Sequence, residues 1–238
     1  MIRTRTSDEC PIRVTAGNVT LEGDLCIPRE AMGVVVFASG SSSIRHNPRN
    51  RYIAQVMRQS GLATLLFDLL TNDEEKVDTQ TGRFRFDIRL LANRLVGATS
   101  WLKQYPDTQC MNIGYFGTNT GAAAALLAAA EHSGDISAIV SRSGRPDLAR
   151  QALPYVKSPT LLIVGGRDLP VIAINRDAFT ELHSEKKMVV VPEASHLFEE
   201  PGALEEVTRL ATNWLANYLN RRVSYSSLAP IFSTSSST

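Results

Sequence analysis

Six short apolar runs, separated by helix-length amphipathic stretches, constrain the fold of this 238-residue chain more than any other feature. The runs are GVVVFAS, LATLLFDLL, MNIGYFG, ISAIVS, PTLLIVGG and KKMVVVPE. Because nearly every residue in a run is apolar, both faces of each strand must be covered, which is typical of a parallel sheet. Strand alternating with helix predicts a doubly wound α/β fold with a mostly parallel sheet and right-handed crossovers.

The stretches between the runs predict helices with recognisable ends. The clearest spans residues 87–103, with Asp87 as its N-cap and one apolar stripe along its length. That stripe consists of Ile88, Leu91, Leu95, Ala98 and Leu102. The other predicted helices span 48–59, 120–132, 170–183 and 203–219.

The two ends of the chain differ in pattern from the part between them. The segment IRVTAGNVTLEGDLCIP alternates apolar and polar residues around a turn at Gly17, which predicts an N-terminal antiparallel hairpin. The last residues, 221–238, are rich in Ser and Thr and lack periodicity, so we expect a mobile tail. We therefore predict one α/β domain over 1–220.

Composition limits the partners. Net charge is +1 and 21% of residues are charged, so no strong field would attract nucleic acid or a membrane surface, and a small-molecule ligand is expected. No signal peptide or membrane-length apolar run is visible, and Cys10, Cys26 and Cys110 have no CxxC spacing. We expect buried cysteines in a cytoplasmic protein. No His, Cys, Asp and Glu cluster has metal-ligand spacing, which predicts no metal. The sequence leaves the oligomeric state open, homo-oligomers included.

Three strand ends carry groups that suggest catalysis. The segment GYFGTNTGAAAA places Asn119 between Gly117 and Gly121, small residues that a sharp turn from strand to helix requires. Asp168 follows the fifth apolar run and His196 follows the sixth. Because parallel strands end at one edge of the sheet, we expect these side chains to meet there. Elbow, acid and histidine is the chain order of a nucleophile–acid–base triad.

These segments resemble the α/β-hydrolase superfamily, specifically its small, lidless dienelactone-hydrolase-like branch, over roughly residues 34–219. The segments PRNRYIAQVMRQSGLATLLFDLLT, FDIRLLANRLVGATSWL, GRPDLA and SHLFEEPGAL carry the similarity along with the three strand ends. The resemblance implies a minimal α/β-hydrolase fold without a large lid. It also implies hydrolysis of an ester, thioester or lactone without any cofactor.

Carried over by position, the resemblance assigns roles to individual residues. The nucleophile position falls on Asn119, the acid on Asp168 and the base on His196. The oxyanion hole falls on the backbone N–H groups of Thr120 and of Ser41, in the segment ASGSSSIRH.

The loop after the first apolar run supplies candidates for substrate binding. Ser39 and Gly40 stand where the family often has His-Gly. Arg45 and His46 are candidates for holding an anionic group, beside further arginines. The alternative is a solvated helix start whose charges pair with neighbours.

Asn119 is the main departure from the family, which has Ser or Cys there. An amide nitrogen cannot be activated by an imidazole as a hydroxyl or thiol can. Loss of the nucleophile from a triad costs about 10⁶ in turnover, so we expect impaired or unconventional hydrolysis. The hydroxyls of Thr118 and Thr120 point elsewhere in such an elbow and are not expected to replace it.

Three other interpretations of Asn119 stay open. The first is hydrolysis of its amide, which would supply the carboxylate that haloalkane dehalogenases and epoxide hydrolases carry at this position. Two observations disfavour it: the next residue is Thr120 rather than a small glycine, and the tryptophan that the dehalogenases usually have beside the nucleophile is missing. An engineered replacement of a native serine is the second. The third is a non-catalytic protein that binds a small ligand or a partner.

Overall fold

The computed structural model describes residues 9–40 and 44–220, and its centre is one eight-stranded sheet. The strands are β1 (Cys10–Ala16), β2 (Val19–Cys26), β3 (Gly33–Ser39), β4 (Ala63–Phe67), β5 (Asn112–Thr118), β6 (Ile136–Arg142), β7 (Thr160–Gly165) and β8 (Lys186–Val191). Their order across the sheet is β1-β2-β4-β3-β5-β6-β7-β8. All pairs from β4 to β8 are parallel, whereas β1–β2 and β2–β4 are antiparallel. The predicted α/β fold and its hairpin are thereby confirmed, and the predicted tail, 221–238, lies outside the described residues.

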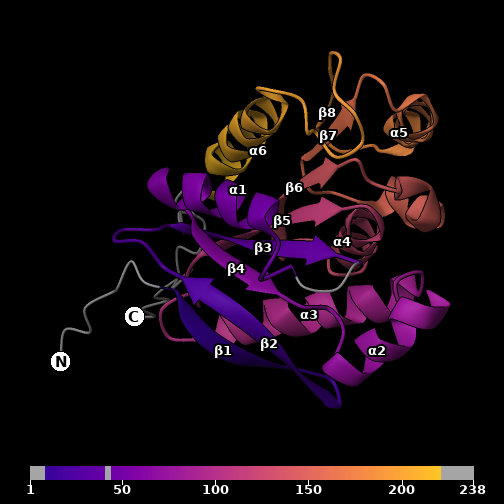
Figure 1. The fold of residues 1–238 in the computed structure, drawn as a ribbon. Helices are drawn as coiled ribbons and strands as arrows, with labels where there is room; N and C mark the ends of the chain where they lie inside the picture. Colours follow the sequence, from indigo (N-terminus) through magenta and orange to yellow (C-terminus); the bar gives the residue numbers. More distant parts are fainter. Residues whose placement is uncertain (1–8, 41–43, 221–238) are drawn as a thin grey trace, which may run out of the picture.

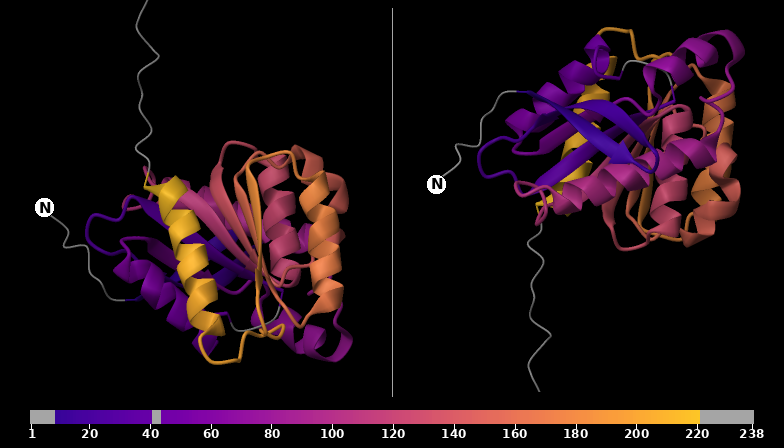
Figure 2. Two further views of the ribbon diagram at one scale, coloured as in Figure 1. Left: turned by 90° about the horizontal axis from the view of Figure 1, so that it is seen from above. Right: turned by 90° about the horizontal axis from the view of Figure 1, so that it is seen from below.

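Helices cover both faces of the sheet (Figures 1 and 2). They are α1 (Pro48–Gln59), α2 (Asn72–Thr81), α3 (Ile88–Gln104), α4 (Thr120–Glu131), the 3₁₀ helix η1 (Pro146–Tyr155), α5 (Leu169–Glu181) and α6 (Ala203–Leu219). Helices α1 and α6 bury one apolar cluster against the sheet, and α3, α4, η1 and α5 share a second on the opposite face. In the described part of the chain, no helix is long and apolar enough to cross a membrane.

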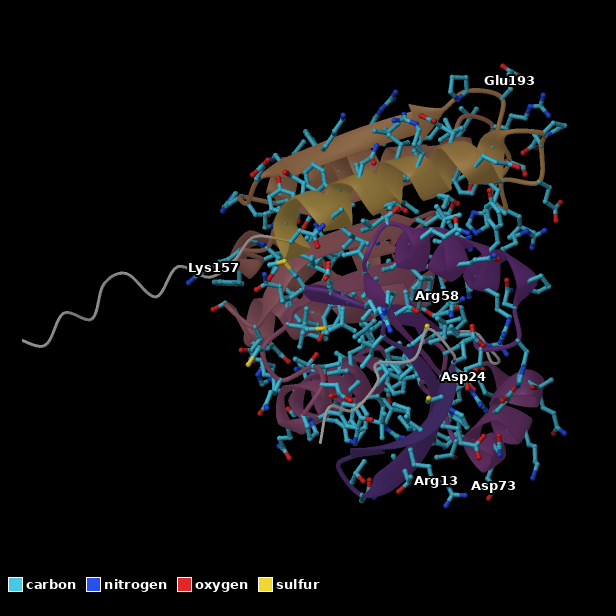
Figure 3. The ribbon with its side chains drawn as sticks, turned by 90° about the vertical axis from the view of Figure 1, so that its left-hand side faces the viewer. Arg13, Asp24, Arg58, Asp73, Lys157 and Glu193 are labelled. Atoms are coloured by element: carbon cyan, nitrogen blue, oxygen red, sulfur yellow. The ribbon has the colours of Figure 1, made fainter. Side chains whose placement is uncertain are left out.

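The parallel strands bring their carboxyl ends to one edge. Lys157, which precedes β7, and Glu193, which follows β8, lie at opposite ends of the molecule in Figure 3. The segments that follow β3, β5, β6, β7 and β8 therefore meet at the edge marked by Glu193. This edge is where an open α/β sheet places its site.

Two elements were not predicted. Helix α2 buries only one residue, Asp78, and so has no apolar stripe for a sequence pattern to reveal. It is fixed at its start by a capping box between Thr71 and Glu74. Element η1 contains Pro154 and a non-helical Ala149, which break the period of a regular helix.

Asp78 organises the segment between α2 and α3. Its carboxylate accepts hydrogen bonds from the N–H groups of Phe84 and Arg85, at 2.7 and 2.8 Å, and from the guanidinium of Arg85 at 2.7 Å. Burial alone would raise the pKa of Asp78, but these donors outweigh it and hold that pKa below its ordinary value. The segment reaches β3, because a Cβ on Gly40 would lie 3.1 Å from the carbonyl oxygen of Arg85. Asp78 therefore supports the backbone beside the end of β3.

The cysteine prediction was wrong for two of three positions. Cys26, at the end of β2, is buried as expected. Cys10 and Cys110 are exposed, because they lie at the start of an edge strand and in the turn before β5.

Candidate active site

The turn from β5 into α4 has the backbone of a strained elbow. Asn119 lies between the two elements with φ 50° and ψ −124°, a backbone conformation that residues other than glycine rarely adopt. A Cβ on Gly117 would lie 2.5 Å from Ala122 Cα, and one on Gly121 would lie 2.6 Å from Ser39 Cα. The two glycines are therefore needed for the close approach of α4 to β3 and β5, as the sequence predicts.

His196 joins the other two candidates. Its Nδ1 lies 2.5 Å from Asp168 Oδ2, and its Nε2 lies 2.8 Å from Asn119 Oδ1. The three side chains follow β5, β7 and β8. In the sequence, Asn119 is 77 positions and Asp168 is 28 positions from His196. When the imidazole carries both protons, it donates one hydrogen bond to the carboxylate and one to the amide oxygen.

Asp168 is held by the helix that it begins. It is the N-cap of α5, and its Oδ1 accepts from the N–H of Val171 at 3.4 Å while its Oδ2 faces His196. The side chain of Asp168 is 14% exposed, against 38% for His196. The carboxylate is therefore fixed and mostly dry, whereas the imidazole remains open to solvent.

The loop that carries His196 is tied down on both sides. The Ser143 hydroxyl donates to the carbonyl oxygen of His196 at 2.9 Å. The N–H of Ser195 donates to Glu200 at 2.9 Å, and Phe198 is buried with a φ of 55°. These contacts set the direction of the imidazole without occupying its ring nitrogens. Ser143 was not identified from the sequence, because the partner of its hydroxyl lies 53 residues further along the chain.

Thr120 and Ser39, two other predicted residues beside the elbow, are both buried. Thr120 is buried with its hydroxyl against Gly40, since a Cβ on that glycine would overlap it, so this hydroxyl faces β3. Ser39 is buried and opposite Thr118 in the sheet. Ser41, the other predicted oxyanion donor, lies outside the described residues.

Arg45 has partners that favour a structural role. Its guanidinium lies 2.8 Å from Asp68, 2.7 Å from Glu22 and 3.7 Å from Asp24. Asp24 and Arg58 are visible on the face where the hairpin lies beside α1 (Figure 3). His46 is exposed in the turn before α1. The structure thus places Arg45 in a network that joins the hairpin to the parallel strands.

Arg142 is a notable residue that sequence reasoning missed. It ends β6 and pairs in register with Thr118, the residue before Asn119. Arg142 is only 9% exposed, its Nη1 has no hydrogen-bond partner among the described residues, and its guanidinium lies 6.0 Å from the Phe116 ring. Burial, together with the charge of Arg49, lowers the pKa of Arg142 to about 10. A lone arginine in the run ISAIVSR gave no signal that its charge would be buried.

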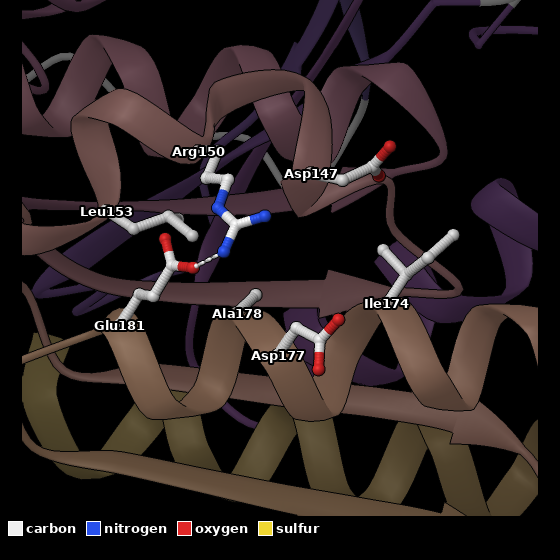
Figure 4. Close-up of a pocket in the computed structure, with 7 residues that line it drawn as sticks. All are labelled: Asp147, Arg150, Leu153, Ile174, Asp177, Ala178 and Glu181. Carbon is white, nitrogen blue, oxygen red and sulfur yellow. Dashed lines mark ion pairs between the residues drawn. The ribbon is translucent and has the colours of Figure 1, made fainter.

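A small pocket lies between η1 and α5, on the face of the sheet that α4 also covers (Figure 4). Its volume is about 50 Å³, and its polar lining includes Asp147, Arg150, Asp177 and Glu181. Arg150 pairs with Glu181 across it, and Asp147 pairs with Arg145. Its lining does not include Asn119, Asp168 or His196. Among the described residues, no group of His, Cys, Asp and Glu could hold a metal ion.

Comparison with known proteins identifies the family. The model described as the dienelactone hydrolase family matches residues 21–219, which include the whole elbow and both of its partners. The chain belongs to the dienelactone hydrolase family. The crystal structure of a dienelactone hydrolase from Anabaena variabilis is 59% identical, has a TM-score of 0.87, and aligns over 89% of this chain and 98% of that one.

Other relatives of this dienelactone hydrolase family member differ in name. Two Mycobacterium tuberculosis proteins called "Putative phosphoribosyl transferase" are 50% identical over 208 residues, which is 87% of this chain but 46% of each relative. The chain therefore spans about half the length of these curated relatives. Est1E from Butyrivibrio proteoclasticus shares the fold at 14% identity, with a TM-score of 0.73 over 89% of this chain and 99% of that one.

Proposed function

We propose that this protein is an ester or lactone hydrolase of the nucleophile–histidine–aspartate type in which Asn119 occupies the nucleophile position. One observation carries the proposal. His196 lies between Asp168 and the side chain of residue 119, with contacts of 2.5 and 2.8 Å. This is the geometry that a general base requires to take a proton from a nucleophile while a carboxylate orients it.

Each part of the site has a defined task in this mechanism. Asp168 orients the imidazole of His196 and stabilises it when it is charged. The backbone N–H of Thr120, and that of Ser41 by family resemblance, would bind the negative oxygen of the tetrahedral intermediate. The amide of Asn119 cannot attack the acyl carbon. Hydrolysis is therefore impaired, and what remains is slow attack by water, with His196 as the general base and the oxyanion hole stabilising the intermediate.

The test is the dependence of weak ester hydrolysis on the imidazole. We expect slow turnover of p-nitrophenyl acetate by the purified protein, and loss of that turnover in His196→Ala. His183→Ala is the matched control, because His183 follows the end of α5, whereas Asp168 caps the start of that helix. Equal turnover by both variants would contradict the proposal.

A second candidate, from a different class, is a protein that binds a small ester-like or carboxylate ligand without turning it over. The amide at residue 119 favours it, because an amide both donates and accepts hydrogen bonds without attacking a bound ester. It predicts saturable thermal stabilisation by a non-hydrolysable ester analogue with no product formed. Hydrolysis that disappears in His196→Ala would exclude this candidate.

The names of the relatives support a class of substrates. The 59% identical structure is named a dienelactone hydrolase, which supports a lactone or a related ester as the substrate class. The transferase name belongs to proteins twice as long as the match, so we do not extend that activity to this chain. We also propose that the protein acts in the cytoplasm on a small molecule and needs no cofactor.

A further inference from the structure

The backbone conformation of Asn119 places its side chain in position to react with the main chain. Viewed along the Cα–C bond, Cβ lies about 120° from the backbone nitrogen of its own residue. A ψ near −120° therefore brings Cβ into an eclipsed position with the backbone nitrogen of the next residue. Asn119 has a ψ of −124°. In a helix or a strand, with ψ of about −42° or about +135°, that nitrogen is turned well away from Cβ. The nitrogen of Thr120 therefore lies on the side from which a five-membered ring can close onto the Asn119 amide carbon.

The amide at this position is also polarised. His196 Nε2 lies 2.8 Å from Asn119 Oδ1, and Asp168 holds the opposite side of the ring. An imidazole N–H that donates to the amide oxygen draws electrons from the amide carbon and favours attack on it. The N–H of Thr120 begins α4, where the first N–H groups have no acceptor within the helix. Both reactants are thus presented without the need to break a helical hydrogen bond.

The surroundings favour the product. A carboxylate at residue 119 would stand at the N-terminus of α4, where the helix dipole stabilises negative charge. Arg142, a buried cation with an unpaired Nη1, ends the neighbouring strand in register with Thr118. Asn119 is only partly buried, so water can reach it.

We propose that Asn119 is a modification site at which the folded protein converts its own asparagine to aspartate. In the first step the nitrogen of Thr120 bonds to the amide carbon, the bond from that carbon to its nitrogen breaks, and ammonia leaves with the Thr120 proton. In the second step water opens the ring, so that hydroxide adds to the side-chain carbon and a proton returns to the Thr120 nitrogen. The reaction consumes one water, releases one ammonia and needs no other reactant.

The product changes the chemistry of the site. A carboxylate can attack carbon as a nucleophile, which an amide cannot. An aspartate beside His196 would displace the leaving group from an alkyl carbon of a substrate and form an ester with that carbon; His196 would then direct water onto the ester, which releases the alcohol and returns the carboxylate. This consequence depends on the proposed role of His196 as base, but the modification itself is read from mass alone.

The test follows residue 119 in freshly purified protein incubated in H₂¹⁸O at neutral pH. Peptide mapping should show a gain of about 3 Da at the peptide with residue 119, compared with about 1 Da in ordinary water. Asn50 and Asn175, both buried in the same chain, serve as internal controls and should keep their amides. Asn119→Gln is the matched variant, because its longer side chain cannot form the five-membered ring.

The rate must depend on the fold and on the imidazole. We expect conversion in the folded protein to be at least about tenfold faster than in the urea-unfolded chain, where the β-branched Thr120 hinders ring closure. His196→Ala, with its fold checked by circular dichroism, should be slower by about tenfold or more. An amide that persists at residue 119, or equal rates in the folded, unfolded and His196→Ala samples, would overturn the proposal. Ester turnover is scored separately, so failure here leaves the hydrolase test intact.

Discussion

Asn119→Ser restores the group that the site lacks and is the most direct test of the proposed chemistry. The substitution places a hydroxyl beside His196, whose Nε2 now lies 2.8 Å from the amide oxygen. The positive φ of residue 119 is unchanged, because both side chains carry a Cβ. Serine therefore replaces asparagine without additional backbone strain.

The size of the gain follows from the geometry. Restoring a triad nucleophile is worth up to about 10⁶ in turnover. The serine oxygen is one bond closer to Cβ than the amide oxygen is, which lengthens its path to His196 by about 1.2 Å. Since a misplacement of about 1 Å can cost about 10²-fold, we expect a gain of about 10⁴ to 10⁶ in kcat. This range is equivalent to about 5–8 kcal/mol of transition-state stabilisation.

The assay is steady-state hydrolysis of p-nitrophenyl acetate, with a burst of p-nitrophenol as the sign of an acyl-enzyme. Asn119→Ala is the matched control, because it removes the same amide but supplies no hydroxyl. Adding His196→Ala to the serine variant should return turnover to the level of the alanine control, since base and nucleophile act as a unit.

A gain below about tenfold in a correctly folded serine variant would refute the reasoning. It would mean that His196 and Asp168 do not act as base and acid despite their 2.5 Å contact. A gain that survives removal of His196 would refute it as well, because the hydroxyl would then be acting without its base.

Three further predictions concern the support of the site. Gly121→Ala should destabilise the protein by about 3 kcal/mol or more in urea unfolding, because its Cβ would overlap the backbone of β3. Gly134→Ala should cost less, because nothing lies within 4 Å of its Cβ and only the strain of its positive φ remains. Asp78→Asn should cost about 2–3 kcal/mol at neutral pH through weakened bonds to Arg85. The fold lowers the pKa of Asp78, so the stability that its charge contributes is fully present above its unfolded pKa and is lost as pH falls through its folded pKa. The difference in stability between the wild type and Asp78→Asn should therefore shrink in acid. Arg142→Met should raise stability by about 1–3 kcal/mol at neutral pH, because it removes a buried charge without a hydrogen-bond partner on Nη1; an unchanged or lower midpoint would contradict this.

The regular part of the fold was predictable from the sequence because its signals are local and periodic. Helices α1 and α6 begin and end where their patterns predict, and Asp87 caps α3 as expected. Apolar runs gave the strands for the same reason, although the run 62–70 forms a strand only to Phe67. Helix α2 was missed because it is held by Asp78 and a capping box rather than by an apolar stripe.

The site was predictable only where chemistry and chain order coincide. Asn119, Asp168 and His196 each follow a strand, and parallel strands bring such ends together whatever lies between them. The contacts of Arg45 could not be predicted, because its carboxylate partners come from β2 and from the end of β4. The buried charge of Arg142 depends in the same way on long-range packing, which no local pattern encodes.

Several features that destabilise the fold lie around residue 119, and they bear on whether the site still has a function. Asn119, Ser143 and Phe198 all have positive φ, and each such residue costs about 1–3 kcal/mol. Arg142 adds a buried charge with an unpaired nitrogen one strand away. If residue 119 had only a structural role, substitutions that relieve these strains would stabilise the fold without loss of function. A site that keeps them together with an oriented imidazole is better explained by a function that needs the geometry, either ligand binding against the amide or chemistry after the amide has been changed.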